Sequence, residues 1–290
     1  MKKALSILTA GCLAVSLAAC GSTVASSAAS AADSTASSAA ESTAASDTAA
    51  ADGQTYKVGI CQLVQHVALD AATQGFKDAL TEQLGDAVTF EEKNAQGDSN
   101  TCSTIINGFV SDNVDLILAN ATPALQAAQA GTNTIPVLGT SVTEYGVALG
   151  IDDFDGLVGT NISGTSDLAP LDEQAGIIKE LFPDAKTVGL LYCSAEPNSQ
   201  YQVDTVKASL EELGYTCEYY AFSDSNDLAT VCQSAADASD VIYVPTDNTV
   251  ANNTEIVNNI CQPAGVPVVA GEEGIMSGCG VATLSISYYD

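Results

Sequence analysis

The feature that most restricts the fold of this chain is a strand-and-helix pattern that occurs twice. Apolar, strand-like runs lie at 56–64 and 187–195, and helical stretches follow them at 67–84 and 199–213. Further strands and helices come in the same order in both halves. Because alternating strands and helices form parallel sheets covered on both faces, we predict an α/β protein with two Rossmann-like lobes.

Changes in residue pattern along the sequence indicate the lobe boundaries. We assign 55–161 to the first lobe and 162–283 to the second, with 284–290 returning to the first lobe. The stretch 156–170 is rich in glycine and hydroxyl residues, which favours a crossing strand and a hinge between the lobes.

The N-terminal segment has the pattern of an export signal. Lys2 and Lys3 precede an apolar run that is too short to span a membrane, so we interpret residues 1–19 as a signal peptide. The run ends in Leu-Ala-Ala-Cys-Gly, which resembles the bacterial lipobox and predicts lipidation of Cys20. The alternative is an ordinary signal peptide that contains Cys20. The remainder of 20–54 is mostly Ser, Ala and Thr, and we expect a disordered linker.

Charge excludes one class of partner. The chain has 36 acidic residues, eight lysines and no arginine, and its net charge is −28. Such a protein is repelled by nucleic acid and by anionic surfaces. Without arginine, no side chain can hold a carboxylate with a bidentate fork, so backbone amides, hydroxyl groups or lysine must bind any anion.

Motifs for catalysis and metal binding are absent from the sequence. It contains no GxGxxG, GxxxxGK, GxSxG or HExxH pattern and no Cys-x-x-Cys pair. We therefore predict no enzyme activity, no cofactor and no metal. Seven cysteines follow the linker, an odd number that leaves their thiol or disulfide state open. His66, the sole histidine, is interpreted as a catalytic base, a ligand contact or a satisfied loop residue.

Polar residues gather where the predicted strands end, and this is where open parallel sheets bind ligands. Thr122-Pro123 is interpreted as an N-cap followed by the first helical residue, which leaves amides free for a carboxylate. Asp247 or the Glu272-Glu273 pair could hold an ammonium group. The combination suits a zwitterion, although these residues could instead be simple helix caps or a solvated turn.

A family resemblance accompanies these patterns. The segments VGICQLVQHVALDAATQGFKDAL, NAQGD, VDLILANATPALQAA, GTSD, YVPTDNTV and VPVVAGEE together resemble solute-binding lipoproteins of ABC importers, in their tryptophan/tyrosine-type branch. The resemblance covers 56–290 and implies the type I periplasmic-binding-protein fold, a monomer anchored to the outer face of the cell membrane, and a permease partner. The implied solute is an amino acid, with an aromatic one as the narrower option.

The resemblance also implies a set of cleft residues. These are Gln62, His66, Ala121, Thr122, Thr140, Ser141, Asp167, Thr246, Asp247 and Glu272. Val67 and Gln65 depart from the proline and glutamate usual in the family, which puts contacts around the first helix in doubt. Family chains continue past the Tyr-Tyr strand, so we expect this chain to be truncated at Asp290.

Three other functions use the same scaffold. A lipoprotein that senses a ligand for a membrane receptor would need the same cleft, and the sequence does not separate it from a transport protein. An exported enzyme would need a catalytic pair that the sequence does not supply. A sugar- or nucleoside-binding protein remains an alternative, although the chain has no tryptophan for stacking.

Overall fold

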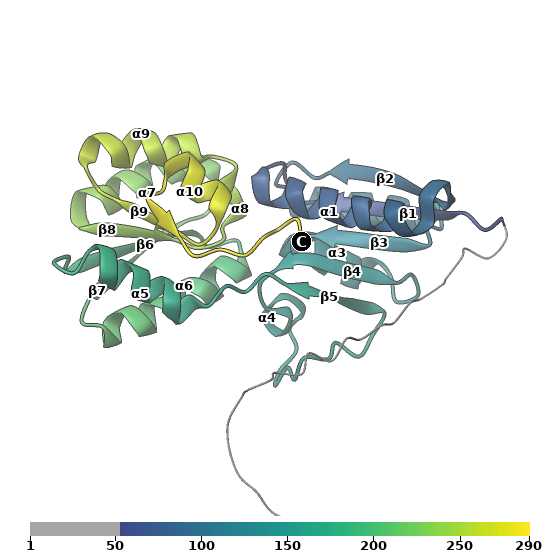
Figure 1. Cartoon of the computed structure of the whole chain (residues 1–290), viewed down its shortest axis with the longest axis horizontal. Coiled ribbons are helices and arrows are strands. Elements are labelled where there is room, and N and C mark those ends of the chain that lie inside the picture. Colours follow the sequence, from purple (N-terminus) through teal and green to yellow (C-terminus); the bar gives the residue numbers. More distant parts are fainter. Residues whose placement is uncertain (1–52) are drawn as a thin grey trace, which may run out of the picture. The chain divides into compact units, whose positions relative to one another are not determined.

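The computed structural model describes residues 53–290, and these contain two parallel five-stranded sheets (Figure 1). Each sheet belongs to one lobe and carries helices on both faces, as the alternation of strands and helices predicted. Among the described residues, no helix is both long enough and apolar enough to span a bilayer. The predicted signal peptide and most of the predicted linker lie outside the described residues.

The first sheet has the strand order β2-β1-β3-β4-β5. Its strands are β1 (Tyr56–Gln62), β2 (Val88–Asn94), β3 (Leu116–Asn120), β4 (Val137–Val142) and β5 (Ile162–Ser166). The helices of this lobe are α1 (Val67–Leu84), the 3-10 turn η1 (Gly85–Ala87), α2 (Ser99–Ser111), α3 (Thr122–Gly131) and α4 (Tyr145–Leu149). Apolar side chains of α1 pack on one face of the sheet, and those of α2, α3 and α4 pack on the other.

The second sheet has the order β10-β9-β8-β6-β7. Its strands are β6 (Thr187–Cys193), β7 (Thr216–Phe222), β8 (Val241–Val244), β9 (Val268–Ala270) and β10 (Ala282–Thr283). The helices are α5 (Leu171–Leu181), α6 (Pro197–Glu212), α7 (Ser225–Ala238), α8 (Asn248–Ala251), α9 (Thr254–Ala264) and α10 (Glu273–Cys279). Helices α5 and α6 cover one face, and α7, α9 and α10 cover the other.

The two sheets repeat one topology, which confirms the predicted duplication. In each sheet, the strand that comes first along the chain, β1 or β6, lies one place in from an edge. The lobe's second strand, β2 or β7, lies on one side of it, and the third, β3 or β8, lies on the other. Parallel pairing throughout brings all the carboxyl ends of a sheet to one edge. The loops that carry the predicted polar residues are therefore gathered at one edge in each lobe.

One predicted boundary needs correction. The sequence pattern places 162–166 in the second lobe, but these residues form β5, which pairs in parallel with β4 in the first sheet. Four of its five residues are exposed, as in an edge strand, so its Gly and hydroxyl residues have the composition of a hinge without forming one. The first crossing between the lobes consequently lies after Ser166.

The C-terminal segment makes the second crossing. After β10, Leu284 accepts a hydrogen bond of 2.8 Å from Nε2 of Gln174 in α5, and Tyr289 reaches Asp78 of α1 with its hydroxyl at 2.7 Å. Figure 1 shows this segment leaving the second sheet and ending beside the first. Residues 284–290 thus return to the first lobe, although they form no strand there.

Candidate functional site

Residues from the carboxyl ends of both sheets surround one cavity. Its volume in this conformation is about 20 Å³, room for about one water molecule, so an amino acid can enter only if the lobes or the lining side chains move apart. Both lobes contribute to its wall, which consists of His66, Ala68, Leu69, Ser141, Thr143, Asp167, Asn198, Thr246, Asp247, Asn248, Ala251, Glu272 and Tyr288.

The predicted cleft residues divide into two groups. The members that line the cavity are His66, Ser141, Asp167, Thr246, Asp247 and Glu272. The members that do not are Gln62, Ala121, Thr122 and Thr140.

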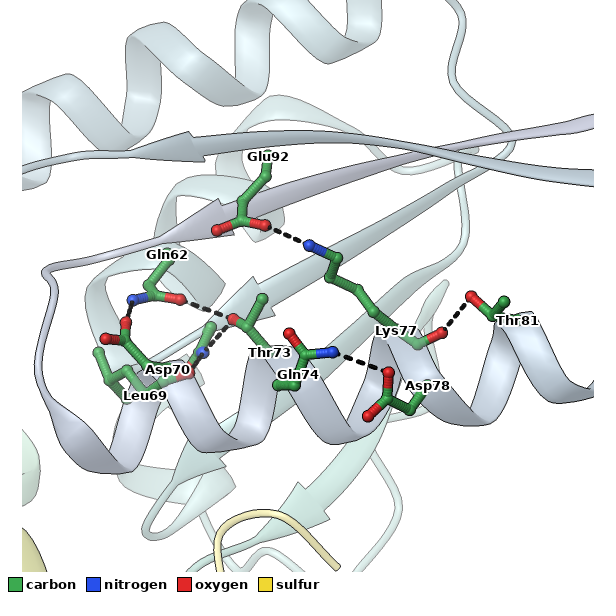
Figure 2. A network of polar contacts seen from close by, with 10 residues as sticks. Gln62, Leu69, Asp70, Thr73, Gln74, Lys77, Asp78, Thr81 and Glu92 are labelled. Atoms are coloured by element: carbon green, nitrogen blue, oxygen red, sulfur yellow. Dashed lines mark hydrogen bonds and ion pairs between the residues drawn. The ribbon is translucent and has the colours of Figure 1, made fainter.

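Gln62 lies beneath the site and supports it. Its side chain is buried, accepts a bond of 2.6 Å from the Thr73 hydroxyl and donates one of 2.7 Å to Asp70 (Figure 2). It also donates a bond of 2.9 Å to the Val64 carbonyl. These contacts tie the end of β1 to the first turns of α1. Gln62 therefore positions the start of α1 rather than contacting the cavity, because its side chain points toward this helix.

The start of α3 differs from the prediction. Ala121, not Thr122, is the N-cap residue, and no side chain caps this helix. Ala121 has a φ of 86°, a backbone conformation that non-glycine residues seldom adopt. Both residues are buried, and Thr140 lines a larger groove beside α1 and the C-terminal segment, which shares Ser141, Asp167 and Tyr288 with the cavity. The expected carboxylate site at Thr122 is therefore not part of this cavity.

Four polar side-chain atoms around the cavity are buried without a hydrogen-bond partner. They are His66 Nδ1, Ser141 Oγ, Asp167 Oδ1 and Asn198 Oδ1. Buried polar atoms are almost always paired, because each unpaired one costs about 1–3 kcal/mol. Four of the six such atoms in residues 53–290 lie around this cavity, where either ordered water or a bound molecule can supply the missing partners.

The backbone is irregular at Ser141, which lines the cavity. The pairing of β4 with β5 shifts register between Gly139 and Val142, and Ser141 within this irregularity has a φ of 54°. A bulge of this kind re-aims a side chain at the end of a strand. Strained backbone of this type is often found at binding sites.

Asp247 and Glu272 serve as helix caps. One oxygen of Asp247 accepts from the Val250 amide at 2.9 Å, and the other accepts from the Cys193 amide at 2.7 Å. Glu272 caps α10 by accepting from the amides of Gly274 and Ile275. Backbone donors already use part of the acceptor capacity of these oxygens, so we favour another carboxylate for the ammonium group, and the role of Asp247 or Glu272 in holding it stays a prediction.

Among the three carboxylates that line the cavity, Asp167 has an oxygen without a hydrogen-bond partner. Its Oδ2 accepts a bond of 2.9 Å from the Tyr288 hydroxyl, whereas Oδ1 has no partner. Burial raises the pKa of Asp167, opposed by the Tyr288 bond and the nearby Thr143 hydroxyl. A cation placed against Oδ1 would stabilise the ionised form.

The electrostatics of the cavity favour a cationic group. Asp167, Asp247 and Glu272 line it, and burial raises the pKa of all three, that of Asp247 to about 8. Among the residues that line it, none is lysine. No group of His, Cys, Asp or Glu within residues 53–290 has an arrangement suited to a metal ion.

Several cavity residues were not predicted, and their positions explain why. Asn198 lies in the first turn of α6, Thr143 lies one residue beyond β4, and Tyr288 comes from the C-terminal crossing. Reading only the last residues of strands overlooks such positions. Pro197 is a usable signal in the sequence, since proline favours the start of a helix, as at Pro123. It would have placed the next residue, Asn198, in the first turn of α6.

Comparison with known proteins identifies the family. The sequence profile described as "ABC transporter substrate binding protein" matches residues 57–290. The chain is an ABC transporter substrate-binding protein. It is also 35% identical to a tyrosine-binding protein of Clostridioides difficile (strain R20291), over 99% of this chain and 80% of the relative. The substrate-binding protein is therefore not an enzyme; it binds a small solute at the extracytoplasmic side for an ABC transporter.

Solved structures agree with this assignment. The substrate-binding protein superposes with a TM-score of 0.78 on a Streptococcus pneumoniae ABC domain in complex with L-Trp, at 32% identity and with 81% and 80% of the two chains covered. A ligand-free, open structure of a Clostridium difficile substrate-binding protein superposes with a TM-score of 0.58 at 38% identity, with the same 81% and 80% of the two chains covered. Our structure is thus more similar to the ligand-bound relative, although its sequence identity to the open one is higher.

Proposed function

We propose that this substrate-binding protein captures a free amino acid, preferably an aromatic one, and passes it to a membrane permease. The observation that carries the proposal is the set of unpartnered atoms around the cavity. Asp167 Oδ1 can accept a hydrogen bond when ionised, and Asn198 Oδ1 is an acceptor because its amide nitrogen donates to the Thr246 carbonyl at 3.0 Å. An ammonium group would satisfy both acceptors.

The start of α1 supports the carboxylate end of such a solute. This helix is 18 residues long, and its N-cap residue His66 makes no side-chain capping bond. Ala68 and Leu69 of the first turn line the cavity, and amides at this position have no partner within the helix. The unpartnered Ser141 hydroxyl lies in the same cavity and could donate to the second oxygen. These donors take the place of the arginine that the chain lacks.

Two observations support an aromatic side chain on the solute. The relatives named above are a tyrosine-binding protein and a protein solved with L-Trp, each more than 30% identical to this chain. Ala68, Leu69 and Ala251 contribute apolar surface to the cavity wall, and Tyr288 contributes a ring. Aromatic and apolar walls with a few placed polar groups are typical of small-molecule sites.

The experiment that tests this function is a screen of the twenty amino acids by thermal shift, followed by calorimetry. A ligand that binds only the folded protein raises its melting temperature. We expect tyrosine, tryptophan or phenylalanine to give the largest shift. Asp167→Asn should weaken binding about 100-fold, since it removes one partner of a buried charge pair. Asp172→Asn, an exposed change in the first turn of α5, is the matched control.

Two results would reject this function. Either no amino acid shifts the melting temperature, or Asp167→Asn binds the best amino acid as tightly as the unaltered protein does.

Anchoring and assembly are further parts of the proposal. We propose that Cys20, outside the described residues, carries lipid that holds the protein at the membrane, and that it acts as a monomer. Detergent phase separation tests the anchor, because Cys20→Ala should move the protein from the detergent phase to the aqueous phase. Light scattering on the detergent-solubilised protein tests the monomer.

A further inference from the structure

A chain of hydrogen bonds crosses from the second lobe to the first at the cavity. Oε2 of Glu196 accepts from the Asn248 side-chain nitrogen at 2.7 Å and from the Asn248 amide at 3.0 Å. Oδ1 of Asn248 lies 3.2 Å from Nε2 of His66. Glu196 and Asn248 stand at the starts of α6 and α8, whereas His66 precedes α1.

The contacts of Glu196 fix the orientation of the Asn248 amide group. Glu196 also accepts from the amide and hydroxyl of Thr249, at 2.9 and 2.8 Å, so its carboxylate is held as an acceptor. The side-chain nitrogen of Asn248 must face this carboxylate. Its oxygen therefore faces His66.

This orientation determines the tautomer of His66. An oxygen opposite Nε2 requires a hydrogen on that nitrogen, and neutral imidazole carries only one. The hydrogen therefore lies on Nε2, and Nδ1 keeps a lone pair. Nδ1 is buried without a hydrogen-bond partner, and His66 lines the cavity.

We propose that lobe closure fixes His66 as the Nε2–H tautomer, that its Nδ1 then accepts a hydrogen bond from the ammonium group of the solute, and that capture expels the proton of His66 into solution below neutral pH. This inference rests on the proposed function, because it concerns the same cavity. His66 Nδ1, Asp167 Oδ1 and Asn198 Oδ1 would together match the three N–H donors of one primary ammonium.

Some neighbours of His66 raise its pKa and others lower it. Burial lowers its pKa, and the Asn248 bond and the charges of Glu196 and Asp70 raise it, with a net lowering. Asp167, Asp247 and Glu272 also line the cavity and oppose the loss of the proton when ionised. An ammonium group beside Nδ1 counteracts these carboxylates, because two positive charges in contact repel.

The tautomer can be observed directly, because His66 is the only histidine of the chain. The full-length protein without a histidine tag, labelled with nitrogen-15 and saturated with L-tyrosine at pH 7.5, should give the nitrogen shifts of an Nε2–H imidazole. An Nδ1–H tautomer or an imidazolium in the complex would overturn the inference.

Proton release is the second measurement. Calorimetry with L-tyrosine in buffers of different ionisation enthalpy should show proton release from His66 at pH 6 and almost none at pH 8, because the ordinary pKa of a solvent-exposed histidine is about 6.5. Asp167 also exchanges protons on binding, so the value assigned to His66 is the difference between the unaltered protein and His66→Gln. Equal release by both would overturn the inference.

A matched pair of substitutions separates the two nitrogens. His66→Gln can still donate to Asn248 but lacks an acceptor at the Nδ1 position, whereas His66→Asn keeps an acceptor there. We expect a loss of affinity for L-tyrosine of at least tenfold in His66→Gln and a smaller loss in His66→Asn. The reverse order would contradict the role of Nδ1. If neither L-tyrosine nor any other amino acid binds the unaltered protein, the proposed function fails together with this inference. If L-tyrosine binds but the Nε2–H tautomer, the proton release from His66 and the order of the two variants are not observed, this inference alone is rejected.

Discussion

The Tyr288 hydroxyl donates a hydrogen bond of 2.9 Å to Asp167, a residue 121 positions earlier in the chain. Asp167 follows β5 at the first crossing between the lobes, and Tyr288 belongs to the second. Both crossings therefore meet at the cavity. The bond occupies Oδ2 of Asp167 and leaves Oδ1 for a solute.

Removing this hydroxyl should weaken solute binding. In Tyr288→Phe the carboxylate loses a donor that stabilises its ionised form, so the pKa of Asp167 should rise further. We expect affinity for the best amino acid to fall about tenfold at pH 7.5 and more at pH 5.5, in keeping with a charge-assisted bond. Tyr289→Phe is the control, since Tyr289 bonds to the exposed Asp78. Equal losses in both variants, measured by calorimetry, would show that the Tyr288 bond has no special role.

The buried acids predict how stability depends on pH. Burial raises the folded-state pKa of Asp167, Asp247 and Glu272 above their unfolded values. Such a group destabilises the folded state increasingly as pH rises from its unfolded pKa, near 4, to its folded pKa, about 8 for Asp247. Asp98 and Asp240 have lowered pKa values, but their stabilisation is lost only below about pH 4. The lowered pKa of His66 acts against this trend below about pH 6.5, but it is one group against three.

The solute-free protein should therefore melt at a higher temperature at pH 5 than at pH 8. We expect the melting temperature to rise by about 3 °C for each kcal/mol gained in the free energy of unfolding, and scanning calorimetry measures it. Asp167→Asn should reduce this pH dependence, because an amide does not ionise. A melting temperature that falls between pH 8 and pH 5 would contradict the assignment of these pKa directions.

Sequence periodicity was sufficient for the fold but not for every site residue. The apolar runs of β1, β6 and β8 identify buried parallel strands, and the duplication follows from their order. Strand ends were a sound guide to the cavity because parallel strands end at one edge. The direction of each side chain was not accessible in the same way. Gln62 ends a strand but faces α1, since alternation along the strand decides the face.

Residue type also failed to separate two roles of acidic side chains. Asp247 and Asp167 both follow strands, and a carboxylate can either cap a helix or receive a solute. The difference lies in the partners: amides from Val250 and Cys193 hold Asp247, whereas one oxygen of Asp167 stays free. The Cys193 contact joins residues 54 positions apart, and no local pattern predicts such a contact.

Two glycines provide a contrast in backbone packing. A Cβ at Gly164 of β5 would clash with the Gly139 carbonyl and the Tyr145 hydroxyl, whereas a Cβ at Gly176 of α5 would meet open space. Gly164→Ala should destabilise the protein by at least about 2 kcal/mol through overpacking. Gly176→Ala should stabilise it by about 0.5–1 kcal/mol, because alanine favours a helix. Urea denaturation measures both, and similar effects of the two changes would contradict the close contact at Gly164.

The cysteines should be unreactive in the folded protein. Burial raises the pKa of Cys193 and Cys217 to about 11 and that of Cys279 to about 12, and it is the thiolate that reacts. Bonds with neighbouring thiols lower the pKa of Cys102 and Cys261, but both side chains are buried out of reach of a reagent. All seven cysteines of the described residues are free thiols. We expect iodoacetamide at pH 8 to modify them slowly before denaturation and completely after it, by mass spectrometry. Fewer than seven modified positions after denaturation would indicate a disulfide, for which Cys232 and Cys261, with sulfurs 3.7 Å apart, are the nearest pair.

Asp247 and Asp167 should respond in opposite ways to the same substitution. Asp247→Asn places a nitrogen opposite one of two backbone amides, and that amide then loses its acceptor. We expect a loss of about 1–3 kcal/mol in the free energy of unfolding, measured with urea. Asp167→Asn removes a buried charge whose Oδ1 has no partner, so the solute-free protein should be at least as stable as before while solute binding weakens. If instead Asp247→Asn abolishes binding at unchanged stability, Asp247 contacts the solute and the assignment of the ammonium group to Asp167 is wrong.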